Sequence, residues 1–402
     1  MTAPDLVEPL LELRVGAVAH GGHCVARTGS GRVVFVRHAL PGELVLAEVT
    51  EQRRAYLRAD TVRVLEPAPD RVVPPCRYAG TCGGCDFQHA GLAAQRDLKA
   101  QVVREQLVRL GRLSPAEVAA LAVRVEPVAV PGRADDGLGW RTRVRFAVDA
   151  TGRAGLLGHR SYAVVPVREC AIAHPAITAL GLTGRSWPRD DLVEAIAGDD
   201  GRVTVCADGS GLVDGPARVH RSAAGVDFEL PPEAFWQVHP GAPAVLVAAV
   251  LALLEPVPGQ RAWDLYGGAG LFAAALAGAV GGTGEVVLVD SDGPALAGAR
   301  ASLAGLRQVR VVPGRVERVR LAPAPDLVVL DPPRSGAGAA VVARVAASGA
   351  RAVAYVACDP AAFARDVATF AGYGWRLDRL RAFDTFPMTH HVECVGRFTP
   401  PA

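Results

Sequence analysis

Two residues near the end of the chain have the chemistry of a covalent catalyst. Cys358 lies in the motif A-C-D-P at 357–360, directly after a strand expected over 354–356. A thiol attacks mainly as its thiolate, and a helix beginning just downstream would lower the pKa of Cys358. Glu393 ends a dense polar segment and stands beside an apolar strand, where partial desolvation would suit a general base. The pair predicts nucleophilic catalysis assisted by a carboxylate.

A glycine-rich turn farther upstream is typical of a nucleotide-type ligand site. The segment 263–270, W-D-L-Y-G-G-A-G, follows a strand and opens a helix, and its glycines let the backbone approach a ligand closely. Asp290 ends the next strand, where a carboxylate can accept hydrogen bonds from ribose hydroxyls. Asp331 follows the buried strand 327–330 and precedes two prolines that hold a rigid turn. Because the pattern is not G-x-G-x-x-G and has no P-loop lysine, S-adenosylmethionine fits better than a dinucleotide or ATP.

Three cysteines gather in one loop, at Cys76, Cys82 and Cys85, with two glycines that let the loop wrap tightly. A fourth ligand must come from a distance, and Cys170 is the best candidate. Three clustered thiolates and one distant thiolate suit an iron–sulfur cluster. Structural zinc is an alternative, although four-cysteine zinc sites usually come as two close pairs. Unligated cysteines are the third possibility.

These residues need a framework that brings several strand ends together. The first 65 residues contain strand-like runs separated by glycine and proline turns, which predicts a small β-barrel; the runs are 15–18, 32–36, 44–49 and 61–65. A helix is expected over about 90–110, and strands dominate from 140 to about 229, with a helix near 176–182. After about residue 232 helices and strands alternate, which predicts a mostly parallel sheet covered on both faces.

The chain therefore divides into three expected domains. Residues 1–66 form the β-barrel, 67–230 form a central β-rich domain that carries the cysteine cluster, and 231–402 form an α/β catalytic domain. The helix at about 90–110 is the part of the central segment that could pack on the catalytic domain.

Composition narrows the class of protein. The chain has 402 residues, half of them hydrophobic, and a formal net charge of +2. Its longest apolar runs, 244–254 and 271–280, fall short of the roughly 20 residues that span a bilayer. The first residues lack the basic start of a signal peptide, so a cytoplasmic protein without disulfides is expected. Positive charge is concentrated locally between 133 and 168, and arginine suits phosphate contact and base stacking.

Taken together, these motifs resemble the RNA uracil carbon-5 methyltransferases, which make 5-methyluridine in transfer or ribosomal RNA. The resemblance covers essentially the whole chain. The segment 34–43, V-F-V-R-H-A-L-P-G-E, resembles a TRAM domain, an RNA-binding module, and the cysteine pattern with Cys170 is similar to the family's 4Fe–4S site. The segment 235–239, F-W-Q-V-H, resembles the family's cofactor-side motif.

The resemblance implies a fold and a role for each site residue. The fold is a Rossmann-like α/β S-adenosylmethionine-dependent methyltransferase domain with an N-terminal TRAM or OB-like barrel and a central iron–sulfur-bearing domain. Cys358 is the nucleophile and Glu393 the base. The residues that contact S-adenosylmethionine are Gln237, Tyr266, Asp290 and Asp331. Two departures from the family pattern stand out, since asparagine is common at the positions of Asp359 and His239.

The expected reaction begins with addition of the thiolate to carbon 6 of uracil, which makes carbon 5 nucleophilic toward the methyl donor. Proton abstraction from carbon 5 and loss of the thiolate complete it, and the base must first leave its stack. Two alternatives belong to other classes. One is an RNA-binding protein that keeps the architecture without catalysis. The other is a methyltransferase for a different nucleobase or for protein, although D-P-P-R at 331–334 lacks the pattern of attack by an exocyclic amine.

Overall fold

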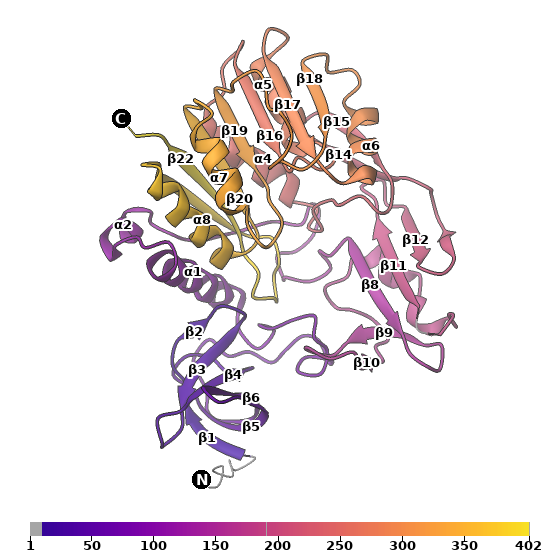
Figure 1. The fold of residues 1–402 in the computed structure, drawn as a ribbon. Coiled ribbons are helices and arrows are strands. Elements are labelled where there is room, and N and C mark those ends of the chain that lie inside the picture. The colour runs from indigo at the N-terminus through magenta and orange to yellow at the C-terminus, as the bar shows by residue number, and fades with distance from the viewer. Residues whose placement is uncertain (1–9, 190, 402) are drawn as a thin grey trace.

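The computed structural model describes residues 10–189 and 191–401. Figure 1 shows a curled sheet near the N-terminus at the bottom, a large sheet covered by helices at the top, and a smaller sheet at the right. Within the described residues, no helix is both long and apolar enough to cross a membrane.

The large sheet has eight strands and carries the C-terminal half of the chain. In spatial order the strands are β18 (Val309–Pro313), β17 (Glu285–Asp290), β16 (Arg261–Leu265), β19 (Leu327–Leu330), β20 (Ala352–Ala357), β22 (Glu393–Thr399), β21 (Arg376–Asp384) and β7 (Val125–Pro127). The strands from β18 to β20 are parallel, and β22 runs antiparallel to both of its neighbours. The expected, mostly parallel sheet is therefore present.

Helices cover both faces of the eight-stranded sheet. One face packs against α4 (Ala242–Leu254), α5 (Leu271–Val280) and α6 (Gly293–Ser302), and the other against α1 (Leu92–Arg109), α7 (Gly338–Ala346) and α8 (Pro360–Gly372). Alternate residues of β19 show this division: Val329 belongs to the first core and Val328 to the second. Burial on both faces explains why the strands read as continuous apolar runs.

The N-terminal sheet has six strands in the order β1-β5-β6-β4-β3-β2 and curls around its own apolar core. The strands are β1 (Leu10–Arg14), β2 (Val18–Ala19), β3 (His23–Arg27), β4 (Val33–Arg37), β5 (Leu44–Gln52) and β6 (Tyr56–Glu66). The strand expected over 15–18 is wrong, because β1 ends at Arg14 and β2 begins at Val18. Residues 15–17 connect the two edges of the sheet instead, and Gly16 donates its N–H to Val25 O (2.8 Å).

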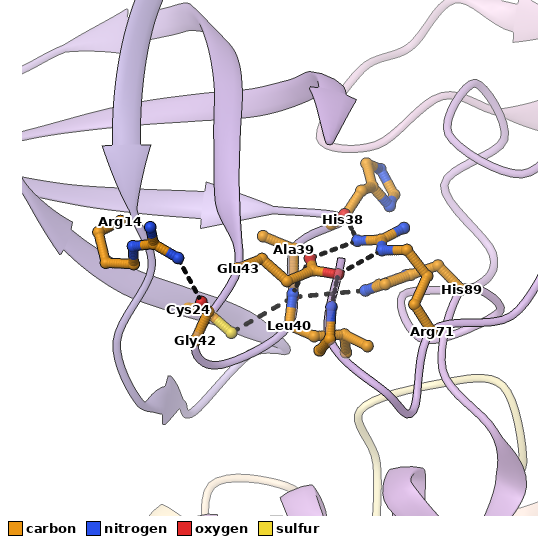
Figure 2. Close-up of polar contacts among 10 residues, drawn as sticks. Arg14, Cys24, His38, Ala39, Leu40, Gly42, Glu43, Arg71 and His89 are labelled. Carbon is orange, nitrogen blue, oxygen red and sulfur yellow. Dashed lines mark hydrogen bonds and ion pairs between the residues drawn. The ribbon is translucent and has the colours of Figure 1, made fainter. Parts of the chain in front are cut away.

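A buried glutamate fixes the segment that leaves the N-terminal sheet. Figure 2 shows Glu43 paired with Arg71 (Oε2 to Nη2, 2.6 Å) and accepting the N–H of Leu40 (2.7 Å). The Ala68 N–H donates to the other carboxylate oxygen (3.1 Å). Burial opposes ionisation, but the hydrogen bonds outweigh it and hold the pKa of Glu43 below its ordinary value. The segment that follows β6 is therefore bound to the sheet that precedes it.

The central part of the chain forms a second six-stranded sheet and a hairpin. The sheet runs β10 (Val164–Val165), β9 (Ala154–Leu157), β8 (Arg143–Val148), β11 (Leu192–Ala197), β12 (Val203–Ala207) and β13 (Gly211–Asp214), and the hairpin joins β14 (Val219–Ala223) and β15 (Val226–Leu230). The expected helix near 176–182 is shorter, as α3 (Pro175–Ala179) followed by a 3-10 turn (Leu182–Gly184).

Two elements of the expected central segment pack on the eight-stranded sheet. The helix α1 lies against α8, as Figure 1 also shows, and β7 extends the sheet beside β21. In chain order, the short helix α2 (Pro115–Ala120) lies between α1 and β7. Sequence reasoning missed β7, because three residues with one proline carry no strand signal of their own.

Candidate active site

The six residues predicted for catalysis and cofactor binding line one cavity of about 980 Å³: Gln237, Tyr266, Asp290, Asp331, Cys358 and Glu393. Asp290 ends β17, Asp331 follows β19 and Cys358 follows β20, so parallel strands deliver all three to the same edge of the sheet. Glu393 reaches that edge from the opposite direction, because β22 is antiparallel and begins with this residue.

The glycine-rich turn fixes one carboxylate of the cavity. The backbone of Tyr266, Gly268 and Gly270 is left-handed, with φ of 61°, 53° and 95°, so the turn is tight enough to start α5 at residue 271. Gly268 N–H donates to Asp290 Oδ2 (2.8 Å), and Asp292 N–H donates to Oδ1 (2.8 Å). The backbone therefore holds the Asp290 side chain in one orientation at the wall of the cavity.

Acids beneath and beside this turn are strongly desolvated. Burial, followed by the nearby charge of Asp290, raises the pKa of Asp331 to about 7. Burial also raises the pKa of Asp264, which is fully buried under the turn, to about 8. Sequence reasoning did not select Asp264, although its place within the strand before the glycine-rich turn was the available signal. A cation bound in the cavity would favour the ionised form of Asp331.

The candidate nucleophile is half-buried and its thiol is held in the protonated form. Burial is the largest cause that raises the pKa of Cys358 to about 12, Glu393 adds to it, and Arg334 opposes it. The expectation of a lowered pKa for Cys358 is therefore wrong. The helix α8 does begin two residues later, but desolvation and neighbouring acids outweigh its effect.

The candidate base is more deeply buried than the nucleophile. Glu393 is only 2% exposed. Burial and then Asp331 raise the pKa of Glu393 well above its ordinary value, while Arg334 lowers it. A carboxylate with a raised pKa is a stronger proton acceptor once it is ionised. Arg334 faces both Cys358 and Glu393, so it is positioned to favour the anionic form of each.

Part of the cavity wall is the loop 385–392 between β21 and β22, here called the wall loop. Lys99 on α1 is fully buried and donates to Asp384 Oδ1 (2.5 Å) and to Phe386 O (3.0 Å). Gln95, one turn earlier on α1, accepts the Met388 N–H (2.8 Å). The helix α1 thus holds the wall loop from behind. Lys99 is the one lysine among 43 basic residues in the sequence, and that was the available signal for its special place.

The cysteine loop (74–89) holds the other end of the wall loop. Asp86 and Phe87 donate their N–H groups to Met388 O (3.0 and 2.9 Å), and Asp86 Oδ2 contacts His390 Nδ1 (2.6 Å). His390 and His391 line the cavity. Burial lowers the pKa of His391 to about 3, so this side chain is neutral.

Arginines line the opposite wall. Arg141, Arg145 and Arg160 come from the locally positive segment 133–168, and they share the cavity with Arg334. Arginine presents a planar set of donors that matches phosphate oxygens. The cavity therefore combines an acidic end near the glycine-rich turn with a cationic wall at the central sheet.

Cys76, Cys82, Cys85 and Cys170 line a second, smaller pocket at the junction of the cysteine loop and the central sheet. Burial raises the pKa of Cys85 to about 12, with contributions from Cys170 and Cys82 that show how near the thiols lie to one another. In residues 10–189 and 191–401, no group of three or more histidine, cysteine or acidic side chains is arranged to hold a metal ion. The four predicted ligands are thus brought to one pocket, without the arrangement a single ion requires.

Comparison with a solved structure defines the fold. The chain is similar to the structure of a tRNA (uracil-54, C5)-methyltransferase from Pyrococcus abyssi in complex with S-adenosyl-L-homocysteine, with a TM-score of 0.71. The two share 22% identity, and the match covers 96% of this chain and 99% of the other. The fold is therefore that of a methyltransferase.

Sequence comparison defines the family. Residues 10–62 match the TRAM domain and 307–398 match the family described as tRNA (Uracil-5-)-methyltransferase. An RNA methyltransferase from Streptomyces avermitilis, itself named as uncharacterized, is 46% identical over 97% of this chain and 98% of its own. The 23S rRNA (uracil(1939)-C(5))-methyltransferase RlmD of Halomonas elongata is 32% identical over 96% and 88%. The chain belongs to the RNA uracil-5-methyltransferase family.

Proposed function

We propose that this protein methylates carbon 5 of a uridine in RNA, with S-adenosylmethionine as the methyl donor. The observation that carries the proposal is the meeting of Cys358 and Glu393 with Gln237, Tyr266, Asp290 and Asp331 around one cavity. A thiol, a carboxylate and an acidic cofactor end are the parts that this reaction needs, and separate strand ends supply them at one edge.

The acidic end of the cavity suits the donor. Asp290 and Asp331 add negative charge where a sulfonium cation would bind, and the left-handed turn at 266–270 gives a ligand close access to the backbone. Tyr266 and Gln237 complete this end of the cavity as aromatic and amide contacts. Bound there, S-adenosylmethionine supplies a methyl group on a positively charged sulfur.

Cys358 and Glu393 carry out the covalent steps. The Cys358 thiolate bonds to carbon 6 of the uracil, and the electrons of the 5,6 double bond make carbon 5 nucleophilic. After carbon 5 has taken the methyl group, Glu393 removes the proton that remains there. The electrons of that carbon–hydrogen bond restore the double bond and expel Cys358 as a thiolate.

The raised pKa of Cys358 makes its ionisation a controlled step. Partial burial and the neighbouring Glu393 raise the pKa of the thiol, so it keeps its proton at neutral pH. A cation bound in the same cavity favours the anionic forms of the side chains around it, as Arg334 already does. We infer that the thiol becomes reactive mainly when the donor occupies the cavity.

The cationic wall and the N-terminal sheet are the proposed RNA contacts. Arginines at 141, 145 and 160 would bind backbone phosphates, which position the RNA without reading its sequence. The 32% identity to the Halomonas elongata enzyme favours ribosomal RNA as the first substrate to test, with transfer RNA as the alternative. The proposed roles of the domains are RNA binding by 1–66, cluster binding by 67–230 and catalysis by 231–402. Although α1 and β7 belong to the second range, they are structural parts of the catalytic unit.

An iron–sulfur cluster of the 4Fe–4S type is the proposed occupant of the cysteine pocket. Its ligands would be Cys76, Cys82, Cys85 and Cys170, an all-thiolate set that suits such a cluster. A structural zinc ion is the alternative, although four-cysteine zinc sites usually come as two close pairs. The bound cluster would tie the cysteine loop to the central sheet through iron–thiolate bonds.

The test uses anaerobically purified protein, a labelled methyl donor and bulk RNA from cells that lack this protein. Wild type and Cys358→Ala are compared, and the RNA is digested to nucleosides. Label in 5-methyluridine from the wild type alone supports the proposal, and fractionation of the RNA then identifies ribosomal or transfer RNA. RNA binding without any label from cluster-loaded protein would favour the binding-only alternative. Equal label from the variant would remove Cys358 as the nucleophile.

A further inference from the structure

The turn that joins β2 to β3 in the N-terminal sheet, residues 19–22, touches the residue that follows the candidate nucleophile. His20 Nε2 lies 3.1 Å from Asp359 Oδ2. The two residues are 339 positions apart in the chain, so only the tertiary structure brings them together. Both side chains are partly exposed, 37% for His20 and 25% for Asp359.

The other oxygen of Asp359 has a separate partner. Asp359 is the N-cap of α8, and its Oδ1 accepts the Ala362 N–H (2.7 Å). One carboxylate therefore caps the helix that begins after Cys358 and, at the same time, binds the N-terminal sheet. Burial opposes ionisation of Asp359, but the hydrogen bonds from His20 and Ala362 hold its pKa below the ordinary value.

A second contact shows that the turn at 19–22 is closely fitted at this place. Gly22 has a left-handed backbone (φ 79°), and a Cβ atom there would lie 2.8 Å from His390 Cβ and 3.1 Å from Asp86 Cβ. The His20 and His390 rings meet edge to face, with centroids 6.5 Å apart. The turn is thus inserted between the wall loop, the cysteine loop and the start of α8.

The N-terminal sheet is also held behind this contact by apolar packing. Its core includes Phe87 and Ala90 from the region of the cysteine loop, and Leu98 and Val102 from α1. Because the sheet shares a core with α1, and α1 lies against α8, the turn at 19–22 meets α8 in a fixed relation. The N-terminal sheet therefore holds His20 in place, so His20 can restrict the position of Asp359.

We propose that His20 is a positioning residue for the Cys358 thiol: through Asp359 it fixes the turn between β20 and α8. The inference rests on the proposed function only for the identity of the reaction. The contact between His20 and Asp359 links the N-terminal sheet to the residue that follows the nucleophile.

The first test is single-turnover methyl transfer to RNA by wild type, His20→Ala, Asp359→Asn and the double variant. We expect His20→Ala to slow the rate between about 10-fold and 100-fold, since a displacement of about 1 Å near the reacting atoms can cost about 100-fold. The dissociation constants for RNA and for S-adenosylhomocysteine should stay within about twofold of wild type. The Asp359→Asn substitution keeps a side chain that can cap the helix. Because His20 acts through Asp359, the double variant should lose less than the product of the two single losses.

The matched control is His220→Ala. His220 forms a comparable exposed pair with Glu229 (2.9 Å) on the β14–β15 hairpin, away from Cys358, and its loss should leave the rate unchanged. Thermal melting of every variant checks the fold. A wild-type rate in His20→Ala would overturn the inference. So would a double variant whose loss is the product of the two single losses, because independent sites act multiplicatively.

A second readout does not depend on methylation. Alkylation of Cys358 by iodoacetamide in RNA-free enzyme, followed by mass spectrometry, reports the reactivity of the thiol. His20→Ala should slow alkylation, and it should do so by a smaller factor in the Asp359→Asn background. If wild type makes no 5-methyluridine but alkylation follows this pattern, the proposed function fails and the positioning role stands. If neither substitution changes the alkylation rate of Cys358, the positioning role fails.

Discussion

Replacing Lys99 by methionine should strongly destabilise the part of the protein that holds the wall loop. Lys99 is fully buried, and its ammonium group contacts Asp384 and Phe386 O. Burial lowers the pKa of Lys99 although Asp384 opposes this, which shows how costly the charge would be without its partner. Lys99→Met leaves the Asp384 charge buried and unpaired, a change that typically costs about 3–5 kcal/mol.

The expected size of the effect can be stated as a melting temperature. For a unit of 150–250 residues, 1 kcal/mol shifts Tm by roughly 2–4 °C, so Lys99→Met should lower the Tm of the catalytic unit by roughly 6–20 °C. Differential scanning calorimetry resolves this transition without assuming that the whole chain unfolds in one step. Arg109→Met is the control, because its exposed pair with Glu105 on the same helix contributes little.

A double substitution tests the reason for the loss. Lys99→Met combined with Asp384→Leu removes both charges, and replacing a buried ion pair by apolar residues is often close to neutral. The double variant should therefore regain most of the Tm lost by Lys99→Met alone. A Tm within about 1 °C of wild type for Lys99→Met, or a double variant that melts lower than the single one, would refute the argument from burial.

Three further predictions concern the site itself. Cys358→Ala should reduce methylation at least about 100-fold, since the thiol acts in chemistry rather than in cofactor binding. The dissociation constant for S-adenosylhomocysteine, measured by calorimetry, should stay within about twofold of wild type. A parallel loss of cofactor binding would contradict this. Because Asp331 has a pKa of about 7 and is charged above it, S-adenosylmethionine should bind more tightly at pH 8 than at pH 6. The affinity for neutral S-adenosylhomocysteine should change less between these pH values, and Asp331→Asn should remove the pH dependence of S-adenosylmethionine binding. Cys82→Ser should lower the iron content and the visible absorbance of anaerobically purified protein. Cys206→Ser, outside the cysteine pocket, should change neither. Zinc in place of iron in the wild-type protein would favour the alternative metal.

The pKa of Asp331 also bears on the pH dependence of the protein's stability. Its folded pKa of about 7 lies above the ordinary value of 3.8, so between these values the folded state keeps a proton that the unfolded state has lost. The contribution of Asp331 to stability is therefore largest at low pH and declines as the pH rises toward about 7. Binding of a cationic ligand above pH 7 should restore the stability lost when Asp331 ionises.

The sequence by itself determined which residues meet at the sheet edge. Apolar runs fixed the strands, and chain order after each strand placed Asp290, Asp331 and Cys358 at its carboxyl end. Since parallel strands deliver those ends to one edge, local pattern was enough to predict that the residues share a cavity. The cysteine spacing was informative in the same way, because three of the four thiols lie in one loop.

Only the tertiary structure decided how that edge is supported and how its groups ionise. Contacts such as Lys99 with Asp384 and His20 with Asp359 join residues 285 and 339 positions apart, and no periodic pattern encodes such pairs. The thiol of Cys358 was expected to have a lowered pKa from its place before a helix, but burial beside Glu393 raises it. A pKa depends on every charge and on the solvent around a group, so it follows from packing in three dimensions rather than from neighbours in sequence.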